Sequence, residues 1–162
     1  MMITLRPLCA GDAKDLFPLL QGVAEKLVED GPSSEEGLES ALSEREQLHE
    51  EGLVRAFTIL KEDVVIGSIR LKFNLSQESG EIGVWLGRAF QGQGYGSQAI
   101  GWVMDEGFET LGLRRIEAHV MAGNVCSEKA FANNGFVWER TLPKGALQRG
   151  RFLDINVFVA VR

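Results

Sequence analysis

The spacing of apolar positions divides the chain into a strand, two helices, three strands, a helix, a strand, a helix and two strands. Strands are predicted where apolar and polar residues alternate, and helices where apolar residues recur every three or four positions. No repeat, linker or low-complexity segment interrupts this order, and 162 residues are enough for a hydrophobic core. We therefore expect residues 1–162 to form a single mixed α/β domain.

The first part of the chain predicts one short strand and two helices. Residues 3–6 alternate weakly and predict the strand, and Asp12 is placed to cap the first helix. After a Gly-Pro break, Ser33 and Glu36 have the spacing of a capping box for a second helix, which runs to about Glu51. The expected inner face of that helix consists of four apolar residues, Leu38, Ala41, Leu42 and Leu48.

The middle of the chain predicts three antiparallel strands followed by a long helix. Residues 55–60 and 64–74 flank Glu62–Asp63 and predict a hairpin, and residues 81–86 form the next strand. Residues 97–111 carry apolar side chains at helical spacing, and the glycine that follows suits a helix end. These apolar positions are Ile100, Val103, Met104, Phe108 and Leu111.

The last part of the chain predicts a strand, a short helix and a closing pair of strands. The strand covers residues 115–121, and the helix covers residues 127–133 before an Asn-Gly stop. The closing strands cover residues 136–142 and 152–161. Between them, the Pro-Lys-Gly segment at 143–145 predicts the connecting loop.

Composition narrows the function classes. The net charge of −6 disfavours a nucleic-acid partner, which would require clustered Lys and Arg. No apolar run approaches the roughly 20 residues of a membrane span, and early charges disfavour a signal peptide. Cys9 and Cys126 form neither a disulfide framework nor a metal-binding pattern. We therefore expect a cytoplasmic protein without a metal, as a monomer or a homodimer.

A glycine-rich segment at residues 91–97, Gln-Gly-Gln-Gly-Tyr-Gly-Ser, carries the main chemical signal. It follows the apolar run at 82–86 and precedes the long helix. Unpaired backbone N–H groups at the positive end of a helix dipole form a site for phosphate oxygens. A side chain at Gly94 or Gly96 is expected to block close approach or a left-handed backbone. The segment therefore predicts a phosphate-bearing cofactor, the alternative being a turn that only connects strand to helix.

Two common phosphate loops do not match this segment. A P-loop needs a lysine after its last glycine, whereas Gly96 is followed by Ser97. A dinucleotide fingerprint needs its third glycine one position later than Gly96, inside a βαβ unit. Glu117 lies at a tolerable distance for a ribose contact, but the strands before the loop are predicted to be antiparallel. Both interpretations are therefore disfavoured.

The remaining pattern, Gln91-x-x-Gly94-x-Gly96, resembles the pyrophosphate loop of the GNAT superfamily of acetyl-CoA-dependent N-acetyltransferases. The resemblance extends over residues 81–158. It includes the strand at 81–86, the Asn124-x-x-Ser127 segment, Gly135–Phe136 and Asp154. The Asn-x-x-Ser form is most similar to the ribosomal-protein N-acetyltransferase (Rim) subgroup. The resemblance implies a central, mostly antiparallel, splayed sheet of about seven strands flanked by about four helices, with acetyl-CoA as co-substrate.

The resemblance also implies a set of cofactor contacts. The backbone of Val84, Trp85 and Leu86 would pair with the pantetheine arm and polarise the thioester carbonyl. Asn124 would reach the cofactor through its side chain, or else cap the helix that follows it. The loop residues that would hold the pyrophosphate are Gln91, Gly92, Gln93, Gly94, Tyr95, Gly96 and Ser97.

The catalytic residues are less sharply indicated. Many GNAT enzymes have a tyrosine acid where this chain has Phe131, so Ser127 or a water becomes the candidate partner of the leaving thiolate, unless Ser127 is only a helix-start serine. Glu81 and His119 are the candidate bases, since an imidazole with a pKa near 6.5 accepts a proton at neutral pH. Each has an alternative as an ordinary strand residue. Asp154, between two apolar residues, is expected to be a buried structural hydrogen-bonding group.

The acceptor is expected to be a primary amine. Deprotonating an α-amine at pH 7 costs about 1.1 kcal/mol, against about 4.6 kcal/mol for a lysine amine. A site without an unambiguous strong base therefore suits the α-amine of a protein or peptide N-terminus. The alternatives are a small amine (a polyamine, an amino acid or an aminoglycoside) and a non-catalytic acyl-CoA-binding module, to which Phe131 lends support.

Overall fold

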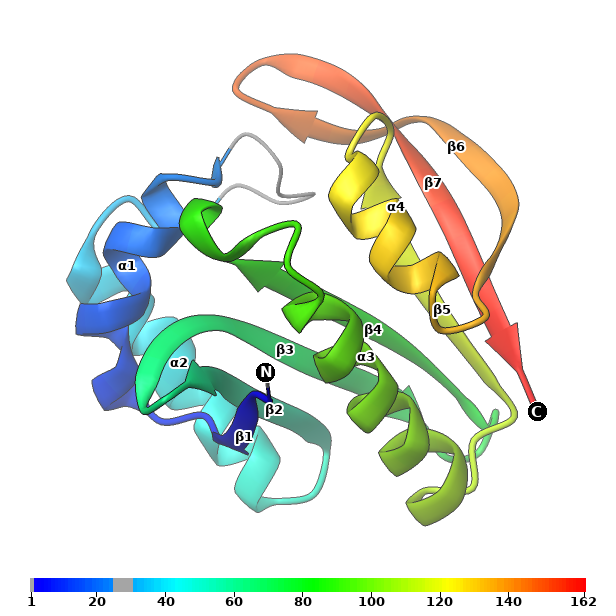
Figure 1. Cartoon of the computed structure of the whole chain (residues 1–162), viewed down its shortest axis with the longest axis horizontal. Coiled ribbons are helices and arrows are strands. Elements are labelled where there is room, and N and C mark those ends of the chain that lie inside the picture. The colour runs from blue at the N-terminus through cyan, green and yellow to red at the C-terminus, as the bar shows by residue number, and fades with distance from the viewer. Residues whose placement is uncertain (1, 25–30) are drawn as a thin grey trace.

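The structure, a computed structural model, describes residues 2–24 and 31–162. In this part of the chain, seven strands form one sheet in the order β1-β2-β3-β4-β5-β7-β6, antiparallel except between β4 and β5 (Figure 1). The strands are β1 Thr4–Pro7, β2 Val54–Lys61, β3 Val64–Asn74, β4 Ser79–Leu86, β5 Arg115–Met121, β6 Val137–Gln148 and β7 Arg151–Val161. The helices are α1 Ala13–Gln21, α2 Glu35–Glu50, α3 Tyr95–Asp105 and α4 Val125–Ala132. The predicted order of elements and the mixed sheet are confirmed.

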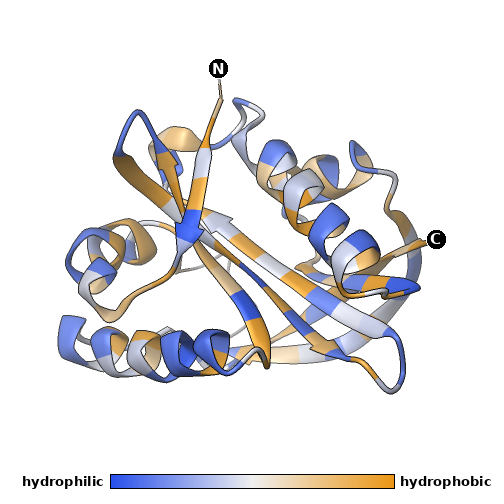
Figure 2. Ribbon diagram, turned by 90° about the horizontal axis from the view of Figure 1, so that it is seen from below, coloured by the Kyte–Doolittle hydropathy of each residue, from blue (hydrophilic) through white to orange (hydrophobic). Residues whose placement is uncertain are grey.

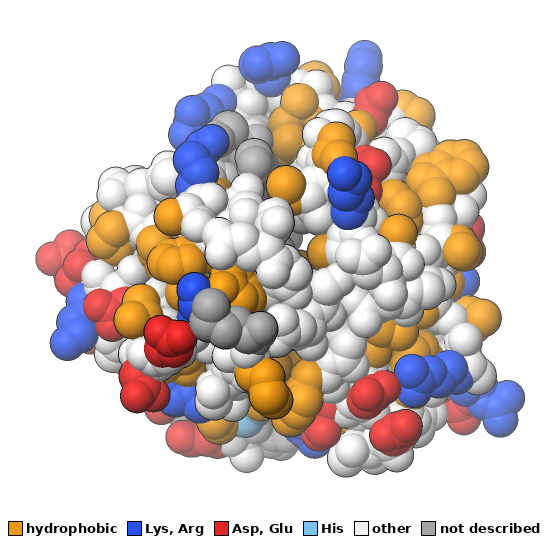
Figure 3. All heavy atoms as spheres, in the orientation of Figure 1, with side chains coloured by type: hydrophobic (Ala, Val, Ile, Leu, Met, Phe, Trp, Pro, Cys, Tyr) orange, Lys and Arg blue, Asp and Glu red, His pale blue; other side chains and the backbone are white. Residues whose placement is uncertain are grey.

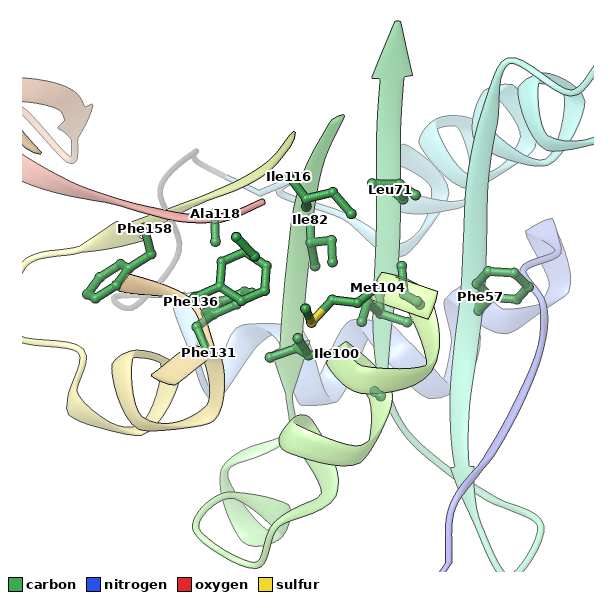
Figure 4. Close-up of a cluster of buried hydrophobic side chains, with 14 of the residues drawn as sticks. Phe57, Leu71, Ile82, Ile100, Met104, Ile116, Ala118, Phe131, Phe136 and Phe158 are labelled. Carbon is green, nitrogen blue, oxygen red and sulfur yellow. The ribbon is translucent and has the colours of Figure 1, made fainter. Parts of the chain in front are cut away.

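Two helical layers cover the sheet, α3 and α4 on one face and α1 and α2 on the other (Figures 1 and 2). The larger core lies under α3 and α4, where Ile82 of β4 and Ile116 of β5 meet Ile100 and Met104 of α3 (Figure 4). The alternation of β5 is as predicted, since Ile116, Ala118 and Val120 are all buried on this face. The intervening side chains of β4 and β5 therefore point to the α1/α2 face.

The two parallel strands in the middle of the sheet separate along their length. Pairing between β4 and β5 runs only from Ser79–Arg115 to Ile82–Ala118. Beyond these residues β4 continues along β3 to Leu86, whereas β5 continues along β7 to Met121. The predicted splayed sheet is thus confirmed, with the opening immediately before the glycine-rich loop.

The hairpin between β2 and β3 turns where the sequence predicts it. Glu62 and Asp63 have φ values of 51° and 66°, the left-handed pair of a two-residue hairpin turn that matches the strand twist. The long helix also ends as expected. It continues beyond α3 through a π-helical turn, Glu106–Thr110, and Gly112 follows with φ 69°.

Three predictions about the first two helices are wrong in detail. Asp12 precedes α1 but does not cap it, because its carboxylate binds Arg6, Thr58 and the N–H of Cys9 instead. The cap of α2 is Ser34 rather than Ser33, and its hydroxyl accepts from the N–H of Gly37 at 3.0 Å. Leu48 is exposed, because α2 turns its inner face toward α1 through Leu38 and Leu42.

The end of the chain differs most from its prediction. Residues 143–145 do not connect two strands but lie within β6, where the register with β7 shifts between Leu142 and Ala146. The turn is further on, at Arg149 and Gly150, whose φ values are 50° and 77°. A proline is tolerated here because β6 is an edge strand and the irregularity needs no ladder donor. The long hairpin extends beyond the sheet at the top of Figure 1.

Asp154 is exposed, so the prediction that it is buried is wrong. It does form a structural hydrogen bond, because its carboxylate accepts from the N–H of Lys144 at 3.0 Å within the irregular part of β6.

Candidate active site

The glycine-rich loop forms the start of α3. Gly92 and Gly94 have φ values of 73° and 88°, a backbone conformation that side chains disfavour. The first intrahelical bond joins the N–H of Gln98 to the carbonyl of Gly94, at 3.1 Å. The amides of residues 95–97 therefore have no acceptor within the helix and lie at the positive end of its dipole.

The side chains of the loop support its shape rather than point toward a ligand. Gln91 donates to the carbonyl of Leu86 at 3.0 Å, and Gln93 donates to the carbonyl of Ala89 at 2.9 Å. The ring of Tyr95 is buried in the core, so this residue can offer a ligand only its backbone.

The expectation for Gly94 is met, but Gly96 has no positive φ. A Cβ at Gly96 would make ordinary contacts, 3.6 Å from Leu86 and 3.8 Å from Ala130. Ser97 joins α3 to α4, because its hydroxyl donates to the carbonyl of Ala130 and accepts from Asn133. Gly92 and Gly94 thus satisfy the conformational requirement, whereas the protein itself leaves room for a methyl group at Gly96.

At the open edge of β4, one residue has a backbone N–H and a carbonyl that are not paired with another strand. The N–H of Gly87 donates to Ile66 of β3 at 2.8 Å, and pairing in an antiparallel ladder alternates. The backbone of Trp85 therefore points to β3, whereas Val84 and Leu86 point to the opening. Because the Leu86 carbonyl already accepts from Gln91, Val84 offers both its N–H and its carbonyl to an added strand.

A cavity of about 1040 Å³ passes through the opening between β4 and β5. On the α3/α4 face it is lined by Gly92, Gly94, Gly96, Ser97, Asn124 and Ser127. On the α1/α2 face it is lined by residues of α1, α2 and the β6 irregularity, with Arg45, Arg70, Lys72, Glu81 and His119 as its charged or titratable groups. The face with α3 and α4 is mostly uncharged at its centre and charged around its rim (Figure 3).

The two candidate bases lie together at the α1/α2 end of this cavity. Nε2 of His119 is 3.9 Å from Oε1 of Glu81 and 3.3 Å from Oε1 of Glu117. Glu117 was not among the predicted catalytic residues. The signal that could have identified it is its position two residues before His119, which places both on one face of β5.

Glu117 also belongs to a group of surface charges. It lies 3.4 Å from Arg115 and 3.5 Å from Arg140, and both arginines contact Glu139. Hydrogen bonds from Arg115 lower the pKa of Glu139 below its usual value, with a smaller contribution from Arg140. The two arginines hold Glu117 beside the imidazole ring.

Asn124 and Ser127 lie at the start of α4. The side-chain oxygen of Asn124 accepts from the N–H of Ser127 at 3.3 Å, so Asn124 caps the helix, as its alternative interpretation proposed. The half-buried Ser127 faces the cavity. Phe131, one turn later, is buried edge-to-face against Phe136, with ring centroids 5.1 Å apart (Figure 4). A phenyl ring donates no hydrogen bond, so Phe131 cannot act as the acid. Ser127 is the residue of α4 that carries a hydroxyl.

The acetyltransferase (GNAT) domain family matches residues 2–137 of the chain. The chain is a member of the GNAT acetyltransferase family. It is related to the Rim ribosomal-protein N-acetyltransferases and is an acetyl-CoA-dependent N-acetyltransferase. The prediction made from residues 81–158 is confirmed, and the alternative of a non-catalytic module is set aside.

The ribosomal-protein-serine acetyltransferase of Escherichia coli (strain K12) is 30% identical to this GNAT enzyme over 129 residues, which are 79% of this chain and 72% of the relative. Among solved structures, a RimL ribosomal L7/L12 alpha-N-protein acetyltransferase superposes with a TM-score of 0.88 at 21% identity, covering 100% of this chain and 91% of that one. The self-immunity acetyltransferase MccE, in complex with acetyl-CoA and AMP, superposes with a TM-score of 0.87 at 20% identity, covering 99% and 92%. At these identities the two structures establish the fold.

The GNAT enzyme has features that fit acetyl-CoA. Two left-handed glycines and the free amides of a helix start suit a pyrophosphate, and the open edge at Val84 suits an extended amide-bearing arm. Within residues 2–24 and 31–162, no helix is both long enough and apolar enough to cross a membrane.

Proposed function

We propose that this GNAT enzyme acetylates the α-amine of a protein or peptide N-terminus, by direct attack within a ternary complex. The observation that carries the proposal is the cavity, which passes through the sheet and has His119 and Glu81 at its α1/α2 end. Two substrates can thus approach the gap between β4 and β5 from opposite faces. The 30% identity to a ribosomal-protein-serine acetyltransferase supports a protein acceptor.

The loop and the β4 edge would hold the donor. The amides of residues 95–97, with Gly92 and Gly94, would bind the pyrophosphate, and several must act together because each exposed contact at a helix end contributes about 0.3–1 kcal/mol. The N–H and carbonyl of Val84 would pair with the pantetheine arm. Bound in this way, acetyl-CoA supplies an activated acyl group at the gap between the strands.

His119, held by Glu117 and close to Glu81, would accept the proton of the incoming ammonium. Deprotonating an α-amine at pH 7 costs about 1.1 kcal/mol, against about 4.6 kcal/mol for a lysine amine. A histidine or glutamate base is sufficient for the smaller cost. This difference favours an α-amine over a lysine side chain.

Ser127 would stabilise the leaving group from the start of α4. In the reaction, a nitrogen–carbon bond forms as the carbon–sulfur bond of the thioester breaks. The ammonium loses one proton to His119 or Glu81 before the attack. The second proton leaves the nitrogen as the amide forms and reaches the departing thiolate through water, while Ser127 donates a hydrogen bond to that thiolate. The products are an N-acetylated acceptor and CoA.

The proposal is tested with a peptide that contains one lysine, in a free and an Nα-blocked form. We expect thiol release from acetyl-CoA with the free peptide and none with the blocked peptide, with mass spectrometry placing the acetyl group on the α-amine. Polyamines, amino acids and aminoglycosides are assayed in parallel. Turnover confined to these small amines, or to the lysine of the blocked peptide, would overturn the proposal.

A further inference from the structure

Arg70 is a charged residue in the cavity that the proposed reaction does not use. It lies on β3 opposite Gly83 of β4 and lines the cavity. A Cβ at Gly83 would lie 3.3 Å from Nε of Arg70, so the absence of a side chain on β4 leaves room for the guanidinium. The register of β3, β4 and β5 places Arg70 on the same face as Glu81 and His119.

This face is not the one that holds the pyrophosphate loop. The neighbours of Arg70 on β3, Ile69 and Leu71, are buried in the core under α3. Alternation therefore directs Arg70 away from α3 and toward α1 and α2, on the side from which the acceptor would approach. A cofactor bound at residues 92–97 would not explain this charge.

The described residues do not neutralise Arg70. Within residues 2–24 and 31–162 it takes part in no hydrogen bond or ion pair, although it is half-buried. The other charged or titratable groups lining this half of the cavity are Arg45, Lys72, Glu81 and His119. The two cations of β3, Arg70 and Lys72, thus share this half of the cavity with one carboxylate and an imidazole, in a protein whose net charge is −6.

Further cations lie on the β6–β7 hairpin, whose residues 145–147 line the cavity. Lys144, Arg149 and Arg151 lie on its outer half, and Lys and Arg side chains gather along the upper edge of the molecule, where this hairpin extends (Figures 1 and 3). A hydrogen bond of 2.7 Å from Gln148 to the carbonyl of Ala24 ties the hairpin to the chain that follows α1. These cations therefore lie on the same hairpin as residues 145–147, which line the acceptor side of the cavity.

We infer that Arg70 binds a carboxylate of the acceptor, and that the enzyme prefers N-termini with Asp or Glu in the first few positions. The guanidinium presents a planar pair of donors that matches a carboxylate, and such charge-assisted bonds are about twice as strong as neutral ones. Lys72 and the hairpin cations would favour further acidic residues. This inference rests on the proposed N-terminal acceptor and names its sequence preference.

The test uses three peptides that differ only in the second residue, which is Glu, Gln or Lys. For the wild-type enzyme we expect kcat/KM to be about tenfold higher for Glu than for Gln, since a charged hydrogen bond contributes on that order. Arg70→Gln should remove the difference without changing the KM for acetyl-CoA. Arg70→Lys should retain part of it, and Arg70→Glu should favour the Lys peptide.

Arg114→Gln is the matched control, because Arg114 is an exposed arginine that pairs with Glu78 outside the cavity. It should leave the order of the three peptides unchanged. Equal rates for the three peptides with the wild-type enzyme would overturn the inference. An equal loss of kcat/KM for all three peptides in Arg70→Gln would also overturn it, and so would a change confined to the KM for acetyl-CoA.

A further comparison separates this inference from the proposed function. β-Alanine and propylamine are small primary amines with and without a carboxylate. If no peptide is acetylated, the N-terminal acceptor is wrong, but a preference for β-alanine that Arg70→Gln removes would still assign carboxylate binding to Arg70. Equal turnover of the two amines in that case would overturn both.

Discussion

Nε2 of His119, one residue beyond the last paired position of β5, lies 3.9 Å from Oε1 of Glu81, one residue before the last paired position of β4. The two strands separate at this point, so the pair faces the gap through which the two substrates would meet. Glu117, 3.3 Å from the same nitrogen, provides the ring with a neighbouring carboxylate. An imidazole and two carboxylates are therefore gathered where the strands separate, and His119 and Glu81 line the cavity.

Removing a base should change the pH dependence of the reaction. We expect His119→Ala to lower kcat/KM by about 10²- to 10⁴-fold and to move the acidic limb of the profile to higher pH, because only the free α-amine would then react. Glu81→Gln should have a smaller effect in the same direction. The measurement is kcat/KM from pH 5 to 9, and Glu78→Gln, at an exposed glutamate paired with Arg114, is the control. If neither cavity variant moves the limb, a water or another residue is the base.

Ser127→Ala should separate the leaving-group role from donor binding. We expect kcat to fall about tenfold or more, because a hydrogen bond to a charged group contributes about 1.5–3 kcal/mol, while the affinity for CoA changes little. The cap of α4 uses the N–H of Ser127 and should survive the change. Steady-state kinetics and CoA titration measure the two effects, and Ser76→Ala, in the turn after β3, is the control. An unchanged kcat would remove Ser127 from the mechanism.

Two alanine substitutions in one loop should have opposite outcomes. Gly94→Ala forces a side chain into a left-handed conformation and should cost about 1–2 kcal/mol of folding stability, together with weaker CoA binding. Gly96→Ala meets only ordinary contacts and should keep the stability of the wild type. Urea unfolding measures the stability, and CoA titration measures binding. A stable Gly94→Ala with normal CoA affinity would contradict the assigned role of the left-handed glycine.

The sequence predicted those features that depend on local spacing. The glycine segment at 91–97, the alternation of β5 and the two-residue turn at Glu62–Asp63 each follow from a few neighbouring residues. It did not predict that, of Val84, Trp85 and Leu86, Val84 is the one whose backbone N–H and carbonyl both face the opening without a partner, because this depends on the register with β3. Nor did it predict that the Pro143 segment lies inside a strand, since an edge position is a property of the assembled sheet.

Asp12 is a single residue whose role could not be predicted from its neighbours in the sequence. Local sequence makes it a helix cap, but Thr58, 46 positions away, donates to its carboxylate at 2.6 Å, and Arg6 does so at 2.7 Å. These long-range partners take the oxygens that a cap would use. The consequence is a buried, charged carboxylate with a structural role.

Asp12 should make the fold sensitive to acid. Burial alone would raise the pKa of this carboxyl, but hydrogen bonds from Arg6, Thr58 and the N–H of Cys9 lower it from its usual 3.8 to about 2. Because the folded pKa is depressed, the stabilisation is complete above about pH 4 and is lost as pH falls toward 2. The shift corresponds to about 2 kcal/mol. We therefore expect Asp12→Asn to lower the free energy of unfolding by at least this amount at pH 7.

The difference in the free energy of unfolding between the wild type and Asp12→Asn should become smaller as pH falls from 4 to 2, because the wild-type carboxylate then loses the charge that the variant lacks. Urea unfolding at pH 7, 5, 4 and 3 measures it. Asp15→Asn is the matched control, since Asp15 lies on the exposed side of α1, and this change should have little effect at any of these pH values. If this difference in the free energy of unfolding stays constant down to pH 3, the destabilisation by Asp12→Asn comes from packing around the amide. The ion pair with Arg6 would then contribute nothing to the acid sensitivity.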